Sequence, residues 1–135
     1  MAKWMLVGLL MLLPWGGPVR ADSYDYDPNL CEAFAHCMDA PFTVPVQGQY
    51  RLTIDMRHCG GLVQNYQITL MGVKRDVPYA TLMVLDQTGH SVGTCDPGHH
   101  VVYIGNVPST AVYTVVVTSG TKRTESCILC YSGAV

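Results

Sequence analysis

The sequence predicts a small exported β-sandwich, and three features indicate it. The chain starts with a segment of secretory signal-peptide form, its later part alternates apolar and polar residues, and Gly- or Pro-containing turns separate the alternating segments. Alternation at a period of two is typical of half-buried antiparallel strands. Several short strands in series are typical of sandwiches and jelly rolls. We therefore expect a mainly β fold, an antiparallel β-sandwich or jelly roll with a short N-terminal helix, stapled by disulfides.

The N-terminal segment combines a basic start at Lys3, an apolar run over 4–14 and a small residue, Ala21, at a suitable cleavage point. The run is well short of the ~20 apolar residues that a membrane span needs. We therefore expect a signal peptide over 1–21 and a single exported domain over 22–135. That domain would be secreted or periplasmic, with no transmembrane span after cleavage.

Charge argues against a nucleic-acid partner. The chain has 10 acidic and 8 basic residues, and two of the basic residues, Lys3 and Arg20, leave with the signal peptide. Nucleic-acid binding requires a clustered basic surface, which this balance does not supply.

A helix is predicted over 28–38. Apolar residues at 30, 33, 34 and 37 follow helical spacing, Asp27 can cap the helix, and Pro28 suits its first turn. Pro41 then prevents its continuation.

We expect strands over 50–56, 65–70, 79–85, 90–94, 99–104, 112–118 and 126–131. Residues 79–85 are apolar on both faces, which is typical of a central strand. Residues 86–89 form a hairpin-type turn in which Gly89 can take positive φ.

The cysteines of an exported chain predict disulfides, and we expect all of them to be oxidised. They are Cys31, Cys37, Cys59, Cys95, Cys127 and Cys130. In the simplest arrangement, long-range bonds staple the N-terminal helix to the C-terminal strand. Cys59 and Cys95, both at turns, then pair with each other.

Local geometry disfavours the two short-range pairs. In a helix Cys31 and Cys37 would stand about 9 Å apart along the axis, beyond the ~7 Å limit for a disulfide. In a strand Cys127 and Cys130 would point to opposite faces, about 10 Å apart. The competing arrangement keeps both short-range pairs by making each segment a turn or loop.

The cysteines and the histidines near them are also candidates for metal binding or redox chemistry. Histidines near cysteines could supply soft copper or zinc ligands, the candidates being His36, His58, His99 and His100. No complete spacing motif joins them, so the sequence predicts no metal and no cofactor. The Cys-Ile-Leu-Cys motif at 127–130 lacks the strand-to-helix context of a thioredoxin-like enzyme, which favours a structural role. Residues 25–36 begin like a calcium-binding loop but lack its glycine and its final glutamate.

Catalytic motifs are missing: the chain contains neither G-x-S-x-G nor H-E-x-x-H. We therefore expect a protein that is not an enzyme.

Residues 42–118 resemble the bacterial pre-peptidase C-terminal domain, a small jelly-roll module of exported proteins. The resemblance lies in Pro-Phe-Thr-Val-Pro-Val at 41–46, the strand at 50–54, the strand and turn at 82–92, and Tyr-Thr-Val-Val-Val at 113–117. It implies a non-catalytic accessory or binding module and carries over no site residue. The cysteines and the N-terminal helix lie outside the pattern.

The expected function is an exported, non-catalytic binding module whose partner is another protein or a ligand of the cell envelope. The alternatives are a periplasmic copper- or zinc-binding or redox protein, and a secreted inhibitor of another protein. Binding residues gather in loops on rigid frames, and 94–100 is the most distinctive loop. Its candidate binding residues are Asp96, His99 and His100.

Overall fold

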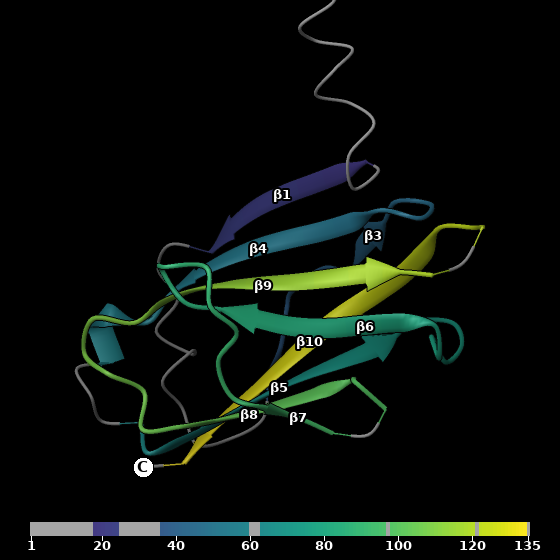
Figure 1. The fold of residues 1–135 in the computed structure, drawn as a ribbon. Helices are drawn as coiled ribbons and strands as arrows, with labels where there is room; N and C mark the ends of the chain where they lie inside the picture. The colour runs from purple at the N-terminus through teal and green to yellow at the C-terminus, as the bar shows by residue number, and fades with distance from the viewer. Residues whose placement is uncertain (1–17, 25–35, 60–62, 97, 121, 135) are drawn as a thin grey trace, which may run out of the picture.

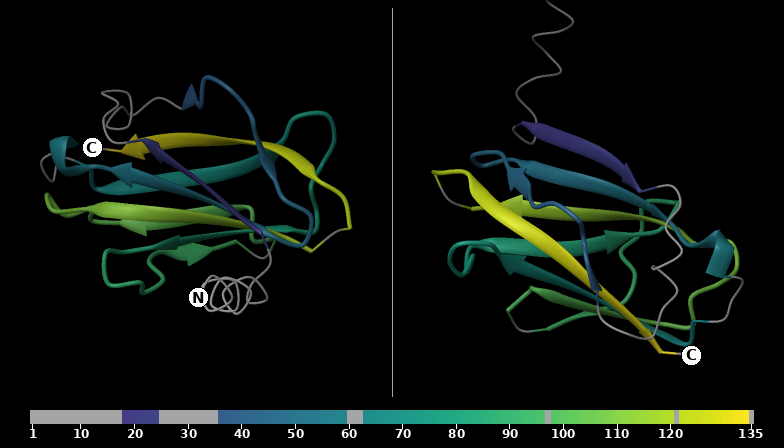
Figure 2. Two further views of the ribbon diagram at one scale, coloured as in Figure 1. Left: turned by 90° about the horizontal axis from the view of Figure 1, so that it is seen from above. Right: turned by 180° about the vertical axis from the view of Figure 1, so that it is seen from behind.

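The computed structural model describes residues 18–24, 36–59, 63–96, 98–120 and 122–134. Within these ranges the chain forms two β-sheets that pack face to face (Figures 1 and 2). The only helical element among the described residues is the 3-10 turn η2 (Arg57–Cys59). The prediction of a mainly antiparallel β-sandwich is therefore confirmed.

One layer is a four-stranded sheet. Its order is β1 (Val19–Tyr24), β4 (Gln49–Asp55), β9 (Val112–Ser119) and β6 (Ala80–Leu85). β1 pairs with β4 in parallel, and the other two pairings are antiparallel. This sheet lies toward the viewer in Figure 1.

The other layer is a six-stranded antiparallel sheet. Its order is β2 (His36–Cys37), β10 (Glu125–Ala134), β5 (Asn65–Gly72), β8 (Val101–Gly105) and β7 (Thr94–Cys95), with β3 (Phe42–Val44) also paired to β10. The view from behind brings β10 to the front (Figure 2, right). β10 thus has β5 along one edge and the two short strands β2 and β3 along the other.

The core lies between the sheets and follows the period of two. On β4, Tyr50, Leu52 and Ile54 are buried while the residues between them are partly exposed. Phe42 of the six-stranded sheet stacks on Tyr50 of the four-stranded sheet, with ring centroids 3.9 Å apart. Each large apolar side chain buried in this way contributes about 1.5–3 kcal/mol relative to an exposed one.

The helix predicted over 28–38 is not supported. Residues 28–35 lie outside the described residues, and His36–Cys37 form β2, in which Cys37 lies opposite Cys130 of β10. Pairing with a neighbouring strand and a covalent bond to it decide the backbone at Cys37, and the helical spacing does not.

Two strand predictions need correction. β6 lies at the edge of its sheet, with Thr81 and Met83 exposed, so 79–85 is not a central strand. The strand predicted at 90–94 shrinks to Thr94–Cys95 and an isolated bridge between Leu85 and Ser91. Gly93 interrupts it with φ +77°, and a Cβ there would lie 2.5 Å from the Tyr103 carbonyl oxygen.

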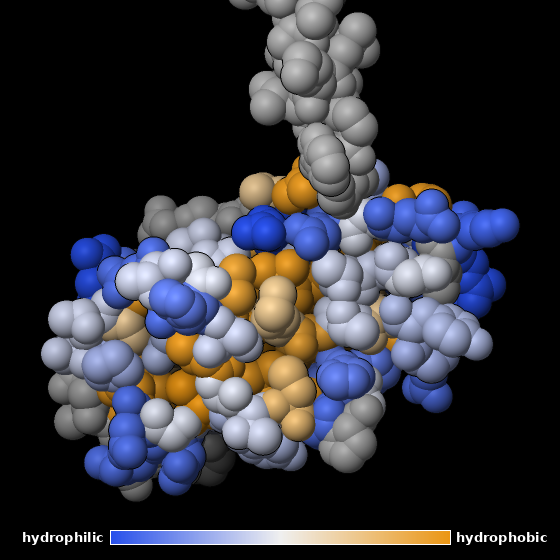
Figure 3. All heavy atoms as spheres, in the orientation of Figure 1, coloured by the Kyte–Doolittle hydropathy of each residue, from blue (hydrophilic) through white to orange (hydrophobic). Residues whose placement is uncertain are grey.

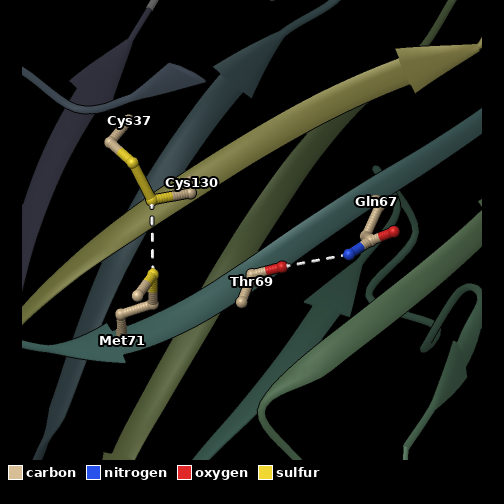
Figure 4. The surroundings of a disulfide bond; sticks show 5 residues. All are labelled: Cys37, Gln67, Thr69, Met71 and Cys130. Carbon is tan, nitrogen blue, oxygen red and sulfur yellow. Dashed lines mark hydrogen bonds between the residues drawn. A yellow bond between two sulfur atoms is a disulfide. The ribbon is translucent and has the colours of Figure 1, made fainter. Parts of the chain in front are cut away.

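A long-range disulfide joins Cys37 to Cys130 across 93 residues of sequence (Figure 4). This confirms a long-range staple to the C-terminal strand and rules out the two short-range pairs. Cys59 is also disulfide-bonded, whereas Cys95 and Cys127 are free. The predictions of complete oxidation and of a Cys59–Cys95 bond are therefore wrong.

The two free thiols have different surroundings. Cys127 faces the core and is fully buried, while Cys95 is exposed on the short strand β7. Cys127 and Cys130 do not pair because three residues along a strand place their side chains on opposite faces of the sheet. The thiol sulfur of Cys127 therefore has no access to the disulfide beside it.

Removing the long-range disulfide should destabilise the fold. The bond closes a very long loop, so the variant Cys37→Ala/Cys130→Ala should lose about 2–4 kcal/mol of unfolding free energy. Urea unfolding of the parent, the double variant and Cys95→Ser measures the loss of unfolding free energy. Cys95→Ser serves as the control because that thiol is free and exposed. Equal stability of the double variant and the parent would contradict a stabilising role for the Cys37–Cys130 disulfide.

Candidate functional site

The loop 94–100 is bound by backbone hydrogen bonds to both sheets. The Leu82 amide of β6 donates to the His99 carbonyl at 2.8 Å, and the Leu70 amide of β5 donates to the His100 carbonyl at 2.7 Å. Two consecutive carbonyls thus bond to strands in different layers of the sandwich. This attachment restricts the conformation of the loop.

Asp96 closes the loop from within. One of its carboxylate oxygens accepts the amides of His100 at 2.8 Å and Val101 at 3.2 Å. Its own amide donates to the Val101 carbonyl at 3.0 Å. The hydrogen bond from the His100 amide is the main reason why the pKa of Asp96 lies below its ordinary value.

The two histidines of the loop differ in their surroundings. The His100 ring is half-buried, and its Nε2 lies 3.0 Å from the Ala80 carbonyl oxygen. His99 is exposed, with φ +59°, a left-handed conformation uncommon for a residue with a side chain. Among the described residues, no hydrogen bond or ion pair engages the His99 side chain. Of the three predicted binding residues, Asp96 and His100 thus hold the loop and His99 is presented to solvent.

A cavity of about 300 Å³ lies beside this loop on the outer face of the four-stranded sheet. Its lining comprises Thr81, Leu82, Met83, Ser91, Cys95, His99, Val116 and Thr118. Figure 3 shows apolar side chains gathered at the centre of this face, over β9 and β6. Val116 is 1% exposed although its side chain points away from the core, and Met83 is its neighbour across the sheet.

Sequence reasoning missed Met83 because it assigned 79–85 to a central strand, where both faces would be covered. The sequence holds only a weak signal for the open face, because Thr81 is the one polar residue of β6. The alternation of exposed Thr81 and Met83 with buried Ala80, Leu82 and Val84 is visible only in the structure.

The other candidate residues do not join this site. His58 lies on η2, at the end of the sandwich opposite the 94–100 loop (Figure 1), and His36 lies on β2. In the part of the chain that the structure describes, no three His, Cys, Asp or Glu side chains come together as a metal-binding group. The calcium-loop-like residues 25–35 lie outside the described residues.

The Cys-Ile-Leu-Cys motif has no redox geometry. Cys130 is bonded to Cys37, and its Sγ lies 3.7 Å from the Met71 Sδ (Figure 4). Burial, with a smaller contribution from the Glu125 charge, raises the pKa of Cys127 to about 11. That thiol is therefore protonated at neutral pH and is a poor nucleophile and a poor metal ligand.

The fold is similar to those of two solved structures. The chain is similar to the Aeromonas hydrophila protein PliG, a periplasmic inhibitor of g-type lysozyme, with a TM-score of 0.57 and 12% identity over 87% of this chain and 100% of that one. It is also similar to the pre-peptidase C-terminal domain of Bacillus anthracis collagenase, with a TM-score of 0.51 and 10% identity over 87% and 97%. The second match confirms, at the level of the fold, the resemblance seen in the sequence.

No protein-family model and no curated protein sequence matches the chain. Of the residues that the structure describes, none belongs to a helix long and apolar enough to cross a membrane.

The division of roles within the loop predicts different effects of two alanine substitutions. Asp96→Ala should lower the melting temperature and speed exchange of the His100 amide, because the carboxylate that accepts that amide is removed. His99→Ala should leave the melting temperature and the exchange rate of the His100 amide unchanged. Thermal unfolding and amide hydrogen exchange check this at neutral pH.

The loss of stability caused by Asp96→Ala should also depend on pH. The pKa of Asp96 is lowered in the folded state. The ionised carboxylate therefore contributes fully to the free energy of unfolding above the ordinary pKa of 3.8, and this contribution disappears as the pH falls through the lowered pKa. Parent and Asp96→Ala should therefore converge in acid. A difference that persisted at the lowest pH would contradict the role assigned to the carboxylate.

Proposed function

We propose that this chain is an exported, non-catalytic module that binds another protein through the loop 94–100. The observation that carries the proposal is the attachment of this loop to both sheets, with the His99 side chain left exposed. A loop restricted before binding loses less conformational entropy when a partner docks. Its contacts therefore contribute more fully to affinity.

The finer proposal is that the chain inhibits a lysozyme of the g-type. PliG is described as an inhibitor of that enzyme class, and the match extends over the whole of its chain. Both similar structures, an inhibitor and a pre-peptidase C-terminal domain, also favour a role other than catalysis. The inhibitor interpretation was one of the alternatives raised by the sequence, and it refines the binding-module proposal.

Export fits the same proposal. A periplasmic or secreted location would follow from cleavage of a signal peptide after Ala21, which falls inside β1. Cleavage there would leave only the last three residues of β1, Asp22–Tyr24, beside β4. The N-terminal sequence of the exported protein should then begin at Asp22, and an intact Met1 on that protein would contradict the proposal.

The inhibitor proposal predicts that the mature chain slows lysis of bacterial cell walls by a g-type lysozyme. His99→Ala should weaken inhibition by roughly tenfold or more, as expected for an exposed residue central to an interface. A turbidity assay with increasing inhibitor measures the effect, with a c-type lysozyme run in parallel for specificity.

His58→Ala is the matched control because His58 is an exposed histidine on η2, at the opposite end of the sandwich (Figure 1). It should inhibit as well as the parent. Inhibition that is lost equally in both variants, or never seen with the parent, would contradict the proposal.

A further inference from the structure

Two residues of the 94–100 loop, Cys95 and His99, bond to Leu82 of β6, which precedes Met83. The Cys95 thiol donates to the Leu82 carbonyl oxygen, with its Sγ at 3.6 Å. The Leu82 amide donates to the His99 carbonyl at 2.8 Å. Met83 follows Leu82 directly and points to the opposite face of the sheet, toward solvent. The Cys95 thiol and the His99 backbone are thus held against the stretch of strand that carries the Met83 thioether.

All three of these residues line the cavity of about 300 Å³ described above. Met83 is 39% exposed, and Cys95 and His99 are exposed as well. Cys95 is a free cysteine, so its sulfur is not consumed by a disulfide. The three residues therefore border one cavity and are accessible from solvent.

The chemistry of the donors selects the ion. Thiolate and thioether sulfur are soft ligands that favour monovalent copper, and imidazole is compatible with it. Zinc takes thiolate, imidazole and carboxylate ligands, usually four of them, and a thioether is not among these.

We propose that Met83, Cys95 and His99 form a binding site for Cu(I). On binding, the Cys95 S–H bond breaks, its proton passes to solvent and an Sγ–Cu bond forms, with no change in the oxidation state of copper. The site is argued from the cavity and its donor residues and not from the proposed inhibitor function, although Cys95 and His99 belong to the loop 94–100.

Competitive titration tests the site. The mature protein, with its disulfides intact, is titrated under anaerobic conditions with Cu(I) against a chromogenic Cu(I) chelator, and native mass spectrometry counts the bound ions. The parent should bind one Cu(I) per chain. Cys95→Ser should abolish this binding, and Met83→Leu and His99→Asn should each weaken it roughly tenfold or more, consistent with loss of a direct ligand.

Cys127→Ala is the matched control because it removes the other free thiol, which is buried in the core. It should retain the parent's affinity and stoichiometry, with folding of every variant checked by circular dichroism. Binding that survives Cys95→Ser, or that is unaffected by both Met83→Leu and His99→Asn, would overturn the site.

The two proposals can fail separately. Met83→Leu lies outside the loop 94–100 and probes copper binding alone, whereas lysozyme inhibition is measured without copper. A parent that inhibits lysozyme but binds no Cu(I) would overturn the metal site only. A parent that binds Cu(I) but inhibits nothing would overturn the inhibitor proposal only.

Discussion

Burial of one face of each sheet against the other is the constraint on which the rest of the structure depends. The inward residues of β4, β5, β9 and β10 alternate with outward ones, so a register shift of one residue would move a whole apolar set into water. The Phe42–Tyr50 stack crosses the space between the layers and ties the short strand β3 to this packing. Once the layers are fixed, the 94–100 loop has little freedom, because it connects β7 to β8 in one sheet and bonds to β6 in the other.

β10 shows how the constraint is reinforced at its edges. It runs through the six-stranded sheet, bonded to β5 on one side and to β2 and β3 on the other. At its start the buried Glu125 carboxylate lies 3.8 Å from the Arg75 guanidinium and 3.6 Å from that of Arg123. A buried charge requires such partners, because leaving it uncompensated would be costly. Ion pairs at one point and the Cys37–Cys130 disulfide at another thus hold a single strand in place.

The sequence allowed prediction of the long strands β4, β5 and β9 but not of β1, whose first half was assigned to a signal peptide, or of the short strands β2 and β3. β4, β5 and β9 bury apolar residues at a period of two, and that pattern is visible without knowing the partner strand. β2 and β3 span two and three residues, too few to show any period, and they exist only because β10 offers them an edge. Pairing of this kind is decided by tertiary contacts, which a local pattern does not contain.

The sequence likewise predicted the position of the candidate loop but not the arrangement of its side chains. The turn chemistry of Asp96 and Gly98 marked the loop, but the sequence placed His99 and His100 on a strand, whereas both precede β8. Which side chains hold the loop and which face solvent depends on contacts with β5 and β6, far away in the sequence. The proximity of Met83 and Cys95 is likewise a product of the fold, because one lies on β6 and the other on β7.

The central claim is that a protein partner docks on the 94–100 end of the sandwich. The most direct measurement is chemical-shift mapping of the isotope-labelled mature protein by NMR as unlabelled g-type lysozyme is added. The account predicts perturbations concentrated at residues 94–100 and the adjoining ends of β6 and β8. Perturbations centred on η2 or on the outer face of β10, or an unchanged spectrum, would contradict it.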